Sequence, residues 1–253
     1  MSSKSRKIHR STIPAVILAA GKGTRMQADA PKAAVRVGGR PMAARVADAM
    51  RGAGITRIVA VVGHRADDVR AAIGCGIEYV VQDEQLGTGH ATRCAQVALA
   101  DYCGPVLVAY ADIPLLTEDD VDRLIDRHIL SGADLTMLTA EPKDPGSLGR
   151  IVRGPDGSVL GIVEARDATD EQLKIREINV GVYCFETPLL FELLGQLRND
   201  NAQSQYYLTD VISLLVAQGR RVGAIPLEVA HNGMGVNTAE ELALAQRLSA
   251  DAR

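Results

Sequence analysis

Hydrophobic and polar positions alternate in blocks along the first half of the chain. Short runs that are apolar at every position are each followed by a stretch with apolar residues at helical spacing. The predicted strand and helix pairs are 15–20 with 42–50, 57–62 with 67–73, 77–81 with 88–99, and 106–110 with 121–129. Continuous apolar strands indicate a parallel sheet that helices cover on both faces. Ligands of such sheets bind at the carboxyl ends of the strands.

A second pattern begins after Asp134. Short strand-like runs are separated there by turns rich in proline and glycine, and they cover residues 135–139, 150–152, 159–163 and 179–185. We therefore predict an α/β protein. Its Rossmann-like, mostly parallel sheet has helices on both faces and carries an inserted, partly antiparallel lobe.

The predicted division of the chain follows these patterns. We expect residues 1–12 to form a flexible basic tail. The main domain then covers 13–253, with the inserted lobe at about 134–220 and a return to the first part at 221–253.

Three helix starts carry capping residues. Thr117 with Asp120, and Thr238 with Glu241, have the spacing of a capping box, and the second pair predicts a helix over 239–248. Thr187 before a proline predicts a cap followed by proline at the first helical position.

Composition excludes several functions. The chain is 47% apolar and 23% charged, with a formal net charge of −3, which is typical of one or two globular domains. It has no tryptophan and two phenylalanines, so it lacks the stacking platforms of single-stranded nucleic-acid binders and no nucleic-acid partner is expected. No apolar run approaches the roughly 18 residues of a membrane span.

The four cysteines and the N-terminus favour a cytoplasmic location. The cysteines show no CxxC pair and are too sparse for a disulfide scaffold, so reduced thiols are expected. No hydrophobic region with a small-residue cleavage site follows the basic N-terminus, which argues against a secretory signal.

The strongest chemical signal is the segment LAAGKGTRM at 18–26, with a Pro-Lys pair at 31–32. Gly21 and Gly23 let backbone N–H groups approach phosphate oxygens because no Cβ blocks them, while Arg25 and Lys32 supply positive charge. A cationic loop at the end of a strand suits a polyphosphate. The phosphate-binding patterns GxxxxGK[ST] and GxGxxG are both absent at this loop.

Further motifs follow in order: QDEQLGTGHA at 82–91, YADIPL at 110–115, GRI at 149–151, IVE at 162–164, DAT at 167–169, EIN at 177–179, YYLTD at 206–210 and GVN at 235–237. Together with LAAGxGTRMxxxxPK they resemble the uridylyltransferase domain of the N-acetylglucosamine-1-phosphate uridylyltransferases, the GlmU family of sugar nucleotidyltransferases. The resemblance runs from about Pro14 to the C-terminus.

This resemblance implies a nucleotide-binding part at 13–133 and 221–253. The residues implied for the nucleotide are Leu18, Ala19, Ala20, Gly21, Gly23, Thr24, Gln82, Gly87, Thr88, Tyr110 and Ala111. A side-chain amide such as that of Gln82 offers both a donor and an acceptor to the uracil edge. His90, inside the same motif, has no chemical role in this scheme, and we expect it to pack at a helix start.

The resemblance also implies a Mg²⁺ cofactor held by Asp112 and Asn237. Magnesium takes one or two protein oxygens and completes its shell with phosphate oxygens and water, so two protein ligands are sufficient. Asn237, beside a helix start, also fits a capping role.

The inserted lobe is the implied sugar-binding part. The residues implied for the sugar are Gly149, Glu164, Asn179, Tyr207 and Thr209, whose polar groups can pair with sugar hydroxyls. Three positions depart from the family pattern and leave the sugar specificity open: Leu148 replaces Tyr, Val180 replaces Thr and Gln205 replaces Glu.

The implied reaction joins UTP to N-acetylglucosamine-1-phosphate, giving UDP-N-acetylglucosamine and pyrophosphate. The attacking phosphate, with a second pKa of about 6, is already ionised at neutral pH and needs no general base. Arg25, Lys32 and Asp112 are the expected catalytic residues, acting through position and charge.

Alternatives stay open at this point. The chain could use another sugar-1-phosphate such as glucose-1-phosphate, or another pyrimidine nucleotide. An inactive regulatory protein that binds a nucleotide sugar is a further alternative. The sequence does not determine the oligomeric state, and because it holds no hexapeptide repeat we do not expect acetyl transfer.

Overall fold

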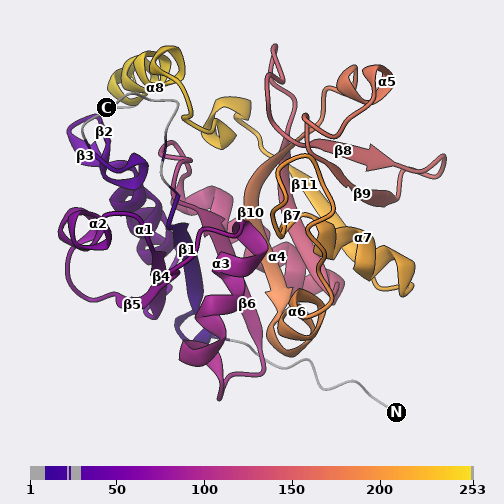
Figure 1. Ribbon diagram of the computed structural model, residues 1–253, viewed down its shortest axis with the longest axis horizontal. Helices are drawn as coiled ribbons and strands as arrows, with labels where there is room; N and C mark the ends of the chain where they lie inside the picture. The colour runs from indigo at the N-terminus through magenta and orange to yellow at the C-terminus, as the bar shows by residue number, and fades with distance from the viewer. Residues whose placement is uncertain (1–8, 22, 24–29, 252–253) are drawn as a thin grey trace.

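The computed structural model describes residues 9–21, 23 and 30–251. Its centre is a nine-stranded sheet in which β11, β7, β10, β6, β1, β4 and β5 lie in that order, while β8 and β9 extend it beside β10 (Figure 1). The strands are β1 Ala15–Ala19, β4 Ile58–Val62, β5 Glu78–Val81, β6 Pro105–Tyr110, β7 Leu135–Ala140, β8 Arg150–Arg153, β9 Val159–Val163, β10 Ile178–Glu186 and β11 Val222–Pro226. A separate two-stranded sheet joins β2 Arg36–Val37 to β3 Arg40–Pro41.

The sheet is mostly parallel, as predicted. β6, β1, β4 and β5 run parallel to one another, and β11 runs parallel to β7. β10 is antiparallel to both of its neighbours, β6 and β7, and it therefore joins the two halves of the sheet. The predicted fold class, α/β with a Rossmann-like sheet, is confirmed.

Helices lie on both faces of the sheet. The α-helices are α1 Met42–Gly52, α2 Ala66–Ile73, α3 Thr88–Cys94, α4 Glu118–Ser131, α5 Asp170–Leu173, α6 Thr187–Leu194, α7 Asp210–Ala217 and α8 Ala239–Asp251. Four 3₁₀ segments are described, η1 Arg10–Thr12, η3 Lys32–Ala34, η4 Ala95–Leu99 and η5 Ala230–Gly233. The helix predicted over 88–99 is therefore divided into α3 and η4. No helix in the described ranges has the length and apolar character needed to cross a bilayer.

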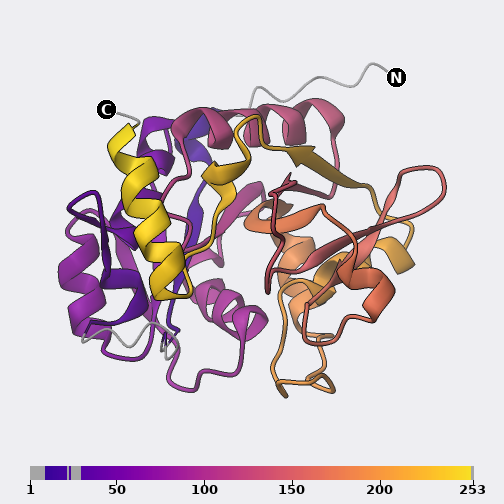
Figure 2. The same cartoon turned by 90° about the horizontal axis from the view of Figure 1, so that it is seen from above.

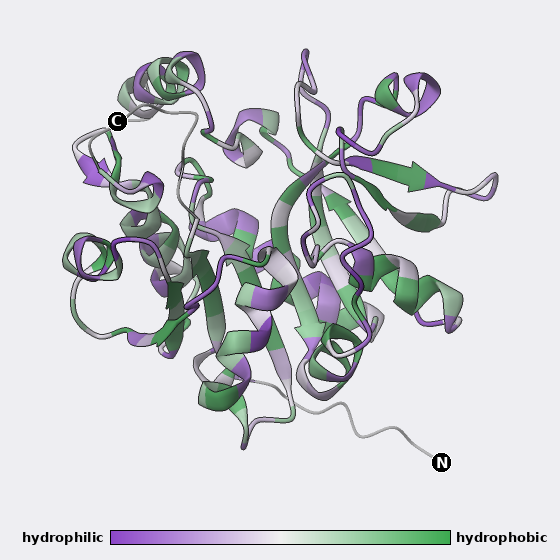
Figure 3. Cartoon of the chain, in the orientation of Figure 1, coloured by the Kyte–Doolittle hydropathy of each residue, from purple (hydrophilic) through white to green (hydrophobic). Residues whose placement is uncertain are grey.

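The core has two main layers, one on each face of the sheet, and a third, smaller cluster that joins β2, α1 and α8. Ile17 of β1 packs in a cluster with residues of α1, α2 and α4, whereas its neighbours Val16 and Leu18 pack with residues of α3, α6 and α7. The strands accordingly show as apolar ribbons between helices of mixed colour (Figure 3). Because both faces are covered, every residue of β1 is buried, which explains its continuous apolar run.

All three helices begin where the sequence predicts them, and two of the three predicted caps are confirmed. Thr117 and Asp120 form the capping box of α4, and the Thr238 hydroxyl accepts from the Glu241 backbone N–H at 3.2 Å at the start of α8. The third prediction is wrong. Thr187 lies inside α6, and its hydroxyl donates to the Gly104 carbonyl at 2.6 Å instead of capping the helix.

The predicted tail is packed at its C-terminal end. Arg10 of η1 pairs with Asp122 and, at 2.7 Å, with Asp126, both on α4. Residues 9–12 therefore lie against the body of the protein, and the flexible segment predicted through residue 12 differs from the structure there. Residues 1–8 lie outside the described residues.

The predicted lobe is likewise smaller than its sequence boundaries. β7 and β10 belong to the central sheet, so the part that projects from it is the β8–β9 hairpin with α5 and the adjoining loops (Figures 1 and 2).

The C-terminal helix lies against the first part of the chain, whereas β11, which the predicted return over 221–253 also includes, pairs with β7. Figure 1 shows α8 beside β2 and β3. Gln246 of α8 donates to the Arg36 carbonyl at 2.8 Å and accepts from the Gly38 backbone N–H at 2.9 Å. These bonds hold α8 against the β2–β3 hairpin.

Candidate functional site

A pocket of about 610 Å³ lies at the carboxyl ends of β1, β5 and β6 and is bounded by the projecting lobe. The predicted site residues that line it are Leu18, Ala19, Ala20, Gly21, Gly23, Lys32, Gln82, Gly87, Thr88, Tyr110, Ala111, Asp112, Gly149, Glu164, Asn179, Tyr207 and Asn237. Thr24 and Arg25 lie outside the described residues. Thr209 is buried behind the pocket wall.

Gly23, which follows β1, lies close to Lys32. Gly23 has a φ of +64°, and a Cβ at this position would stand 2.5 Å from the Lys32 Cβ. A side chain is therefore excluded at Gly23 by both conformation and contact. At Gly21 a Cβ would meet nothing within 4 Å, so packing alone does not require glycine there.

Lys32, Asp112 and Asn237 meet in the pocket although they are far apart in the chain. The Lys32 ammonium donates to the Asn237 side-chain oxygen at 2.7 Å and pairs with the Asp112 carboxylate. The Val236 backbone N–H donates to the Asp112 carbonyl at 2.9 Å, which joins the loop after β6 to the segment before α8. The Asp112 carboxylate and the Asn237 amide oxygen thus both contact the Lys32 ammonium.

This donor set suits a hard cation. Mg²⁺ prefers oxygen ligands and is commonly held by one or two protein groups together with phosphate oxygens. Within the described ranges there is no group of three or more His, Cys, Asp or Glu side chains that could form a complete metal site. The two oxygens of Asp112 and Asn237 therefore fit an ion that shares its coordination with a bound phosphate.

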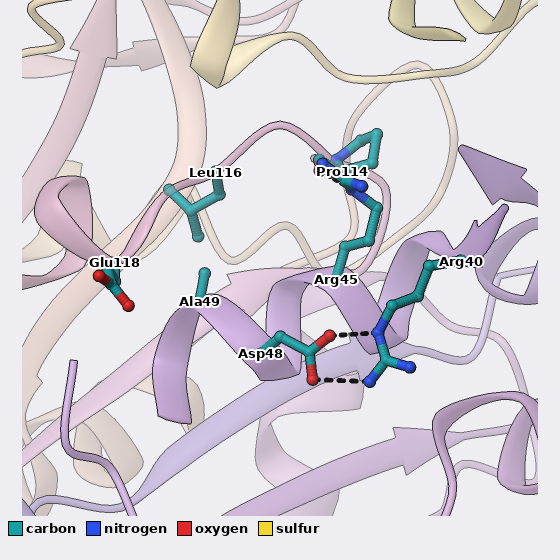
Figure 4. A pocket seen from close by; sticks show the side chains of 7 residues that line it. All are labelled: Arg40, Arg45, Asp48, Ala49, Pro114, Leu116 and Glu118. Carbon is teal, nitrogen blue, oxygen red and sulfur yellow. Dashed lines mark hydrogen bonds and ion pairs between the residues drawn. The ribbon is translucent and has the colours of Figure 1, made fainter. Parts of the chain in front are cut away.

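Arg45 of α1 holds the loop that carries Asp112 in place. The Arg45 Nε donates to the Pro114 carbonyl at 2.6 Å, at the edge of a second pocket of about 350 Å³ (Figure 4). Figure 4 also shows the Arg40 guanidinium paired with both oxygens of the Asp48 carboxylate. This second pocket lies beside the loop, and the Arg45 bond to Pro114 anchors the loop to α1.

Gln82, which directly follows β5, lines the part of the pocket predicted to bind the nucleotide, here called the nucleotide half. Its side chain is buried, and its amide nitrogen donates to the Gly87 carbonyl at 3.1 Å and faces the His90 Nδ1 at 2.9 Å. Thr88 accepts from the Leu208 backbone N–H at 3.0 Å, which links the start of α3 to the lobe. His90 was predicted only to pack at a helix start, and its contact with Gln82 is a finding of the structure.

Glu164 lies at the centre of the part of the pocket predicted to bind the sugar, here called the sugar half. Its carboxylate accepts from the Thr209 hydroxyl at 3.0 Å. Burial raises the pKa of Glu164, and the bond from Thr209 opposes that rise because it favours the charged carboxylate. Thr209, which is 1% exposed, therefore does not reach the pocket but holds the carboxylate that does.

Asn179 lies in a small polar network on β10. Its side chain donates to the Tyr183 hydroxyl at 2.7 Å and accepts from the Gly181 backbone N–H at 3.1 Å. The Tyr183 hydroxyl lies 3.5 Å from that of Tyr110. Burial raises the pKa of both tyrosines, so both hydroxyls remain protonated donors.

Several residues of the pocket wall were not predicted from the sequence. These are Ala33, Gln85, Ala91, Ser147, Ala165, Arg166, Gln203 and Gly235. Leu148, Val180 and Gln205, the three positions that depart from the family pattern, also line the pocket. Gln203 donates to the Tyr207 hydroxyl at 2.8 Å and accepts from Arg166 at 3.1 Å. Arg166 follows Glu164 closely in sequence, and that proximity was the available signal for it.

The fold and the pocket together define an α/β protein with its candidate site at the carboxyl ends of a mostly parallel sheet. Residues 15–207 match the MobA-like NTP transferase domain, and the chain belongs to this family.

Curated relatives agree with this assignment. The chain is 48% identical over 238 residues to the bifunctional protein GlmU of Syntrophotalea carbinolica, covering 93% of this chain and 51% of that protein. It is 46% identical over 232 residues to the bifunctional protein GlmU of Exiguobacterium sibiricum, covering 92% of this chain and 51% of that one. The chain thus spans about half the length of the curated relatives it matches. The family resemblance found in the sequence is confirmed.

A solved structure shares the fold. A crystal structure from Bacillus anthracis, described as a glucose-1-phosphate thymidylyltransferase in complex with a sucrose, superposes with a TM-score of 0.77. It is 19% identical, and the match covers 94% of this chain and 96% of that one. At this identity the likeness shows the fold alone.

Proposed function

We propose that this chain transfers a uridylyl group from UTP to N-acetylglucosamine-1-phosphate, forming UDP-N-acetylglucosamine and pyrophosphate. The observation that carries the proposal is that one pocket is lined both by residues predicted for the nucleotide and by residues predicted for the sugar. Lys32, Asp112 and Asn237 lie in the wall of this pocket. The high identity to proteins named GlmU, over nearly the whole of this chain, supports the same reaction.

The proposed chemistry requires no protein nucleophile. An oxygen of the sugar phosphate attacks the α-phosphorus of UTP, a new P–O bond forms, and the bond to the pyrophosphate breaks. The attacking oxygen is already ionised, so the protein contributes orientation and charge stabilisation. The Lys32 ammonium is placed to neutralise phosphate charge, and Arg25, which lies outside the described residues, remains a predicted partner in this role.

Asp112 and Asn237 would hold Mg²⁺, as the converging oxygens described above fit it. When bound there, the ion would supply charge neutralisation between phosphate groups. Both residues sit on segments that the Val236–Asp112 backbone bond fixes, so their oxygens are held in place before substrates arrive.

A second sugar is favoured by a specific observation. Leu148 and Val180, which stand where the family has Tyr and Thr, both line the pocket, so its wall is more apolar at these points. Two hydroxyl groups that could form hydrogen bonds to a sugar are therefore absent from this wall. Glucose-1-phosphate is therefore the second candidate substrate.

The substrates proposed are small molecules, and we propose a cytoplasmic enzyme. All four cysteines are free, which agrees with a reducing compartment.

The test is a substrate panel with matched variants. Purified protein is incubated with UTP, Mg²⁺ and either N-acetylglucosamine-1-phosphate or glucose-1-phosphate, and pyrophosphate release and product mass are measured. Asp112→Asn and Lys32→Met should each lower kcat by about 100-fold or more, in line with the loss of one preorganised charged group. Asp119→Asn, an exposed carboxylate on α4, is the control and should leave kcat unchanged.

Two results would refute the proposal. The first is no pyrophosphate release with either sugar phosphate, and binding of UDP-N-acetylglucosamine without turnover would then favour the regulatory alternative. The second is wild-type kcat in Asp112→Asn.

A further inference from the structure

The Gln82 side-chain amide is held from two sides. It is 3% exposed, and it follows β5 at the floor of the nucleotide half of the pocket. Its nitrogen lies 3.1 Å from the Gly87 carbonyl oxygen and 2.9 Å from the His90 Nδ1. Gly87 is the residue before α3 and His90 lies in its first turn, so both partners belong to one rigid element.

These contacts determine which way the amide faces. A backbone carbonyl can only accept a hydrogen bond, so the nitrogen of the Gln82 amide must face Gly87. The second hydrogen of that nitrogen then points at the His90 Nδ1, which must accept it. The tautomer of His90 with its proton on Nε2 makes this contact, and the Gln82 oxygen is then the group left for the pocket.

We propose that His90 is a positioning residue for base selection. It fixes the Gln82 amide so that its oxygen faces the bound base. The site then accepts a pyrimidine with an N–H donor at ring position 3, as in uracil, and disfavours one with an acceptor there, as in cytosine. This inference rests on the proposed function, because it places the base of UTP beside Gln82.

The contact with His90 is needed because the bond to Gly87 alone does not fix the orientation of the Gln82 amide. With the Gly87 bond alone, the Gln82 side chain keeps one fixed point and can tilt its oxygen away from the pocket. His90 is half-buried on α3, which keeps its ring in place against the amide. Loss of one neutral hydrogen bond changes an equilibrium by about fivefold to tenfold, so the preference for UTP over CTP should fall by that factor.

Two variants separate positioning from packing. His90→Leu keeps an apolar body of similar size but removes the acceptor. His90→Asn shortens the side chain but places an oxygen near the position of Nδ1. Calorimetry measures the dissociation constants of UTP and CTP for each variant. His9→Leu, an exposed histidine before β1, is the control.

The expected result is a fivefold to tenfold smaller UTP preference in His90→Leu, and recovery of most of it in His90→Asn. A wild-type ratio in His90→Leu would overturn the inference, and so would failure of His90→Asn to recover the preference. Because binding is measured, a protein that prefers UTP but releases no pyrophosphate would contradict the proposed function and leave the inference standing.

A spectroscopic measurement on the wild-type protein covers the case in which the variants do not fold. In ¹⁵N spectra of histidine-labelled protein, His90 should show the neutral form with the proton on Nε2 and an accepting Nδ1. Observation of the proton on Nδ1 would overturn the inference.

Discussion

Gly87 connects the nucleotide half to the lobe, and Gly87→Ala tests how tightly. Its φ of +112° and ψ of 175° lie in a region that side-chain-bearing residues rarely adopt. An added Cβ would stand 2.5 Å from the Tyr206 carbonyl oxygen and 2.9 Å from the Tyr206 nitrogen. Both atoms are already bonded, since the carbonyl accepts from the Gly89 N–H at 2.8 Å and the Tyr206 N–H donates to the Leu86 carbonyl at 2.8 Å.

The cost of Gly87→Ala has two parts. The backbone conformation costs about 1–3 kcal/mol. Displacement of Tyr206 weakens two backbone hydrogen bonds worth about 1 kcal/mol each. The total is about 3–5 kcal/mol of unfolding free energy, or a fall in Tm of roughly 10 °C for a domain of this size.

Urea unfolding followed by circular dichroism measures this cost, and Gly74→Ala is the matched control. Gly74 has a φ of +95°, but a Cβ there would meet nothing within 4 Å. The control therefore carries only the conformational part, about 1–3 kcal/mol. If Gly87→Ala costs no more than Gly74→Ala, the contact with Tyr206 does not stabilise the protein and the reasoning fails.

Two further predictions concern carboxylates of the lobe. Burial and the charges of Asp167 and Asp200 raise the pKa of Asp210 to about 6, so the folded chain binds this proton more tightly than the unfolded chain and stability falls as the pH rises from about 4 through 6. Asp210→Asn should therefore raise the unfolding free energy by about 1 kcal/mol at pH 8, a value reduced by solvent screening, and by nothing at pH 4; equal gains at both pH values in urea unfolding would contradict this. Thr209→Val removes the bond to Glu164 and should raise the KM for the sugar phosphate about fivefold, with the KM for UTP unchanged in steady-state kinetics. An equal change in both KM values would show that Thr209 acts on the whole fold.

The local elements of this protein could be predicted from its sequence. Continuous apolar runs indicated the buried parallel strands, and residue spacing indicated the capping boxes at Thr117 and Thr238. The glycine turn after β1 and the carboxylate after β6 were also visible, because their position at strand ends follows from the order of the chain. These features depend on neighbouring residues, whose interactions the sequence displays directly.

Some elements gave no clear local signal. α7 is a short apolar run that periodicity cannot distinguish from a strand. β11 contains glycine and proline and is only half-buried, because it lies at the edge of the sheet. Its pairing with β7 stabilises it, and that pairing joins segments far apart in the chain.

The tertiary structure alone decided which polar groups from distant segments meet. Lys32 and Asn237 lie 205 positions apart, and the return of α8 to β2 brings them together. Thr187 does not cap α6 as predicted, because its hydroxyl donates to the Gly104 carbonyl, which folding brings within reach. The sequence by itself determined the elements and the kinds of side chain available, since both depend on local interactions. The partners of those side chains depend on contacts between distant segments, which exist only once the sheet has assembled.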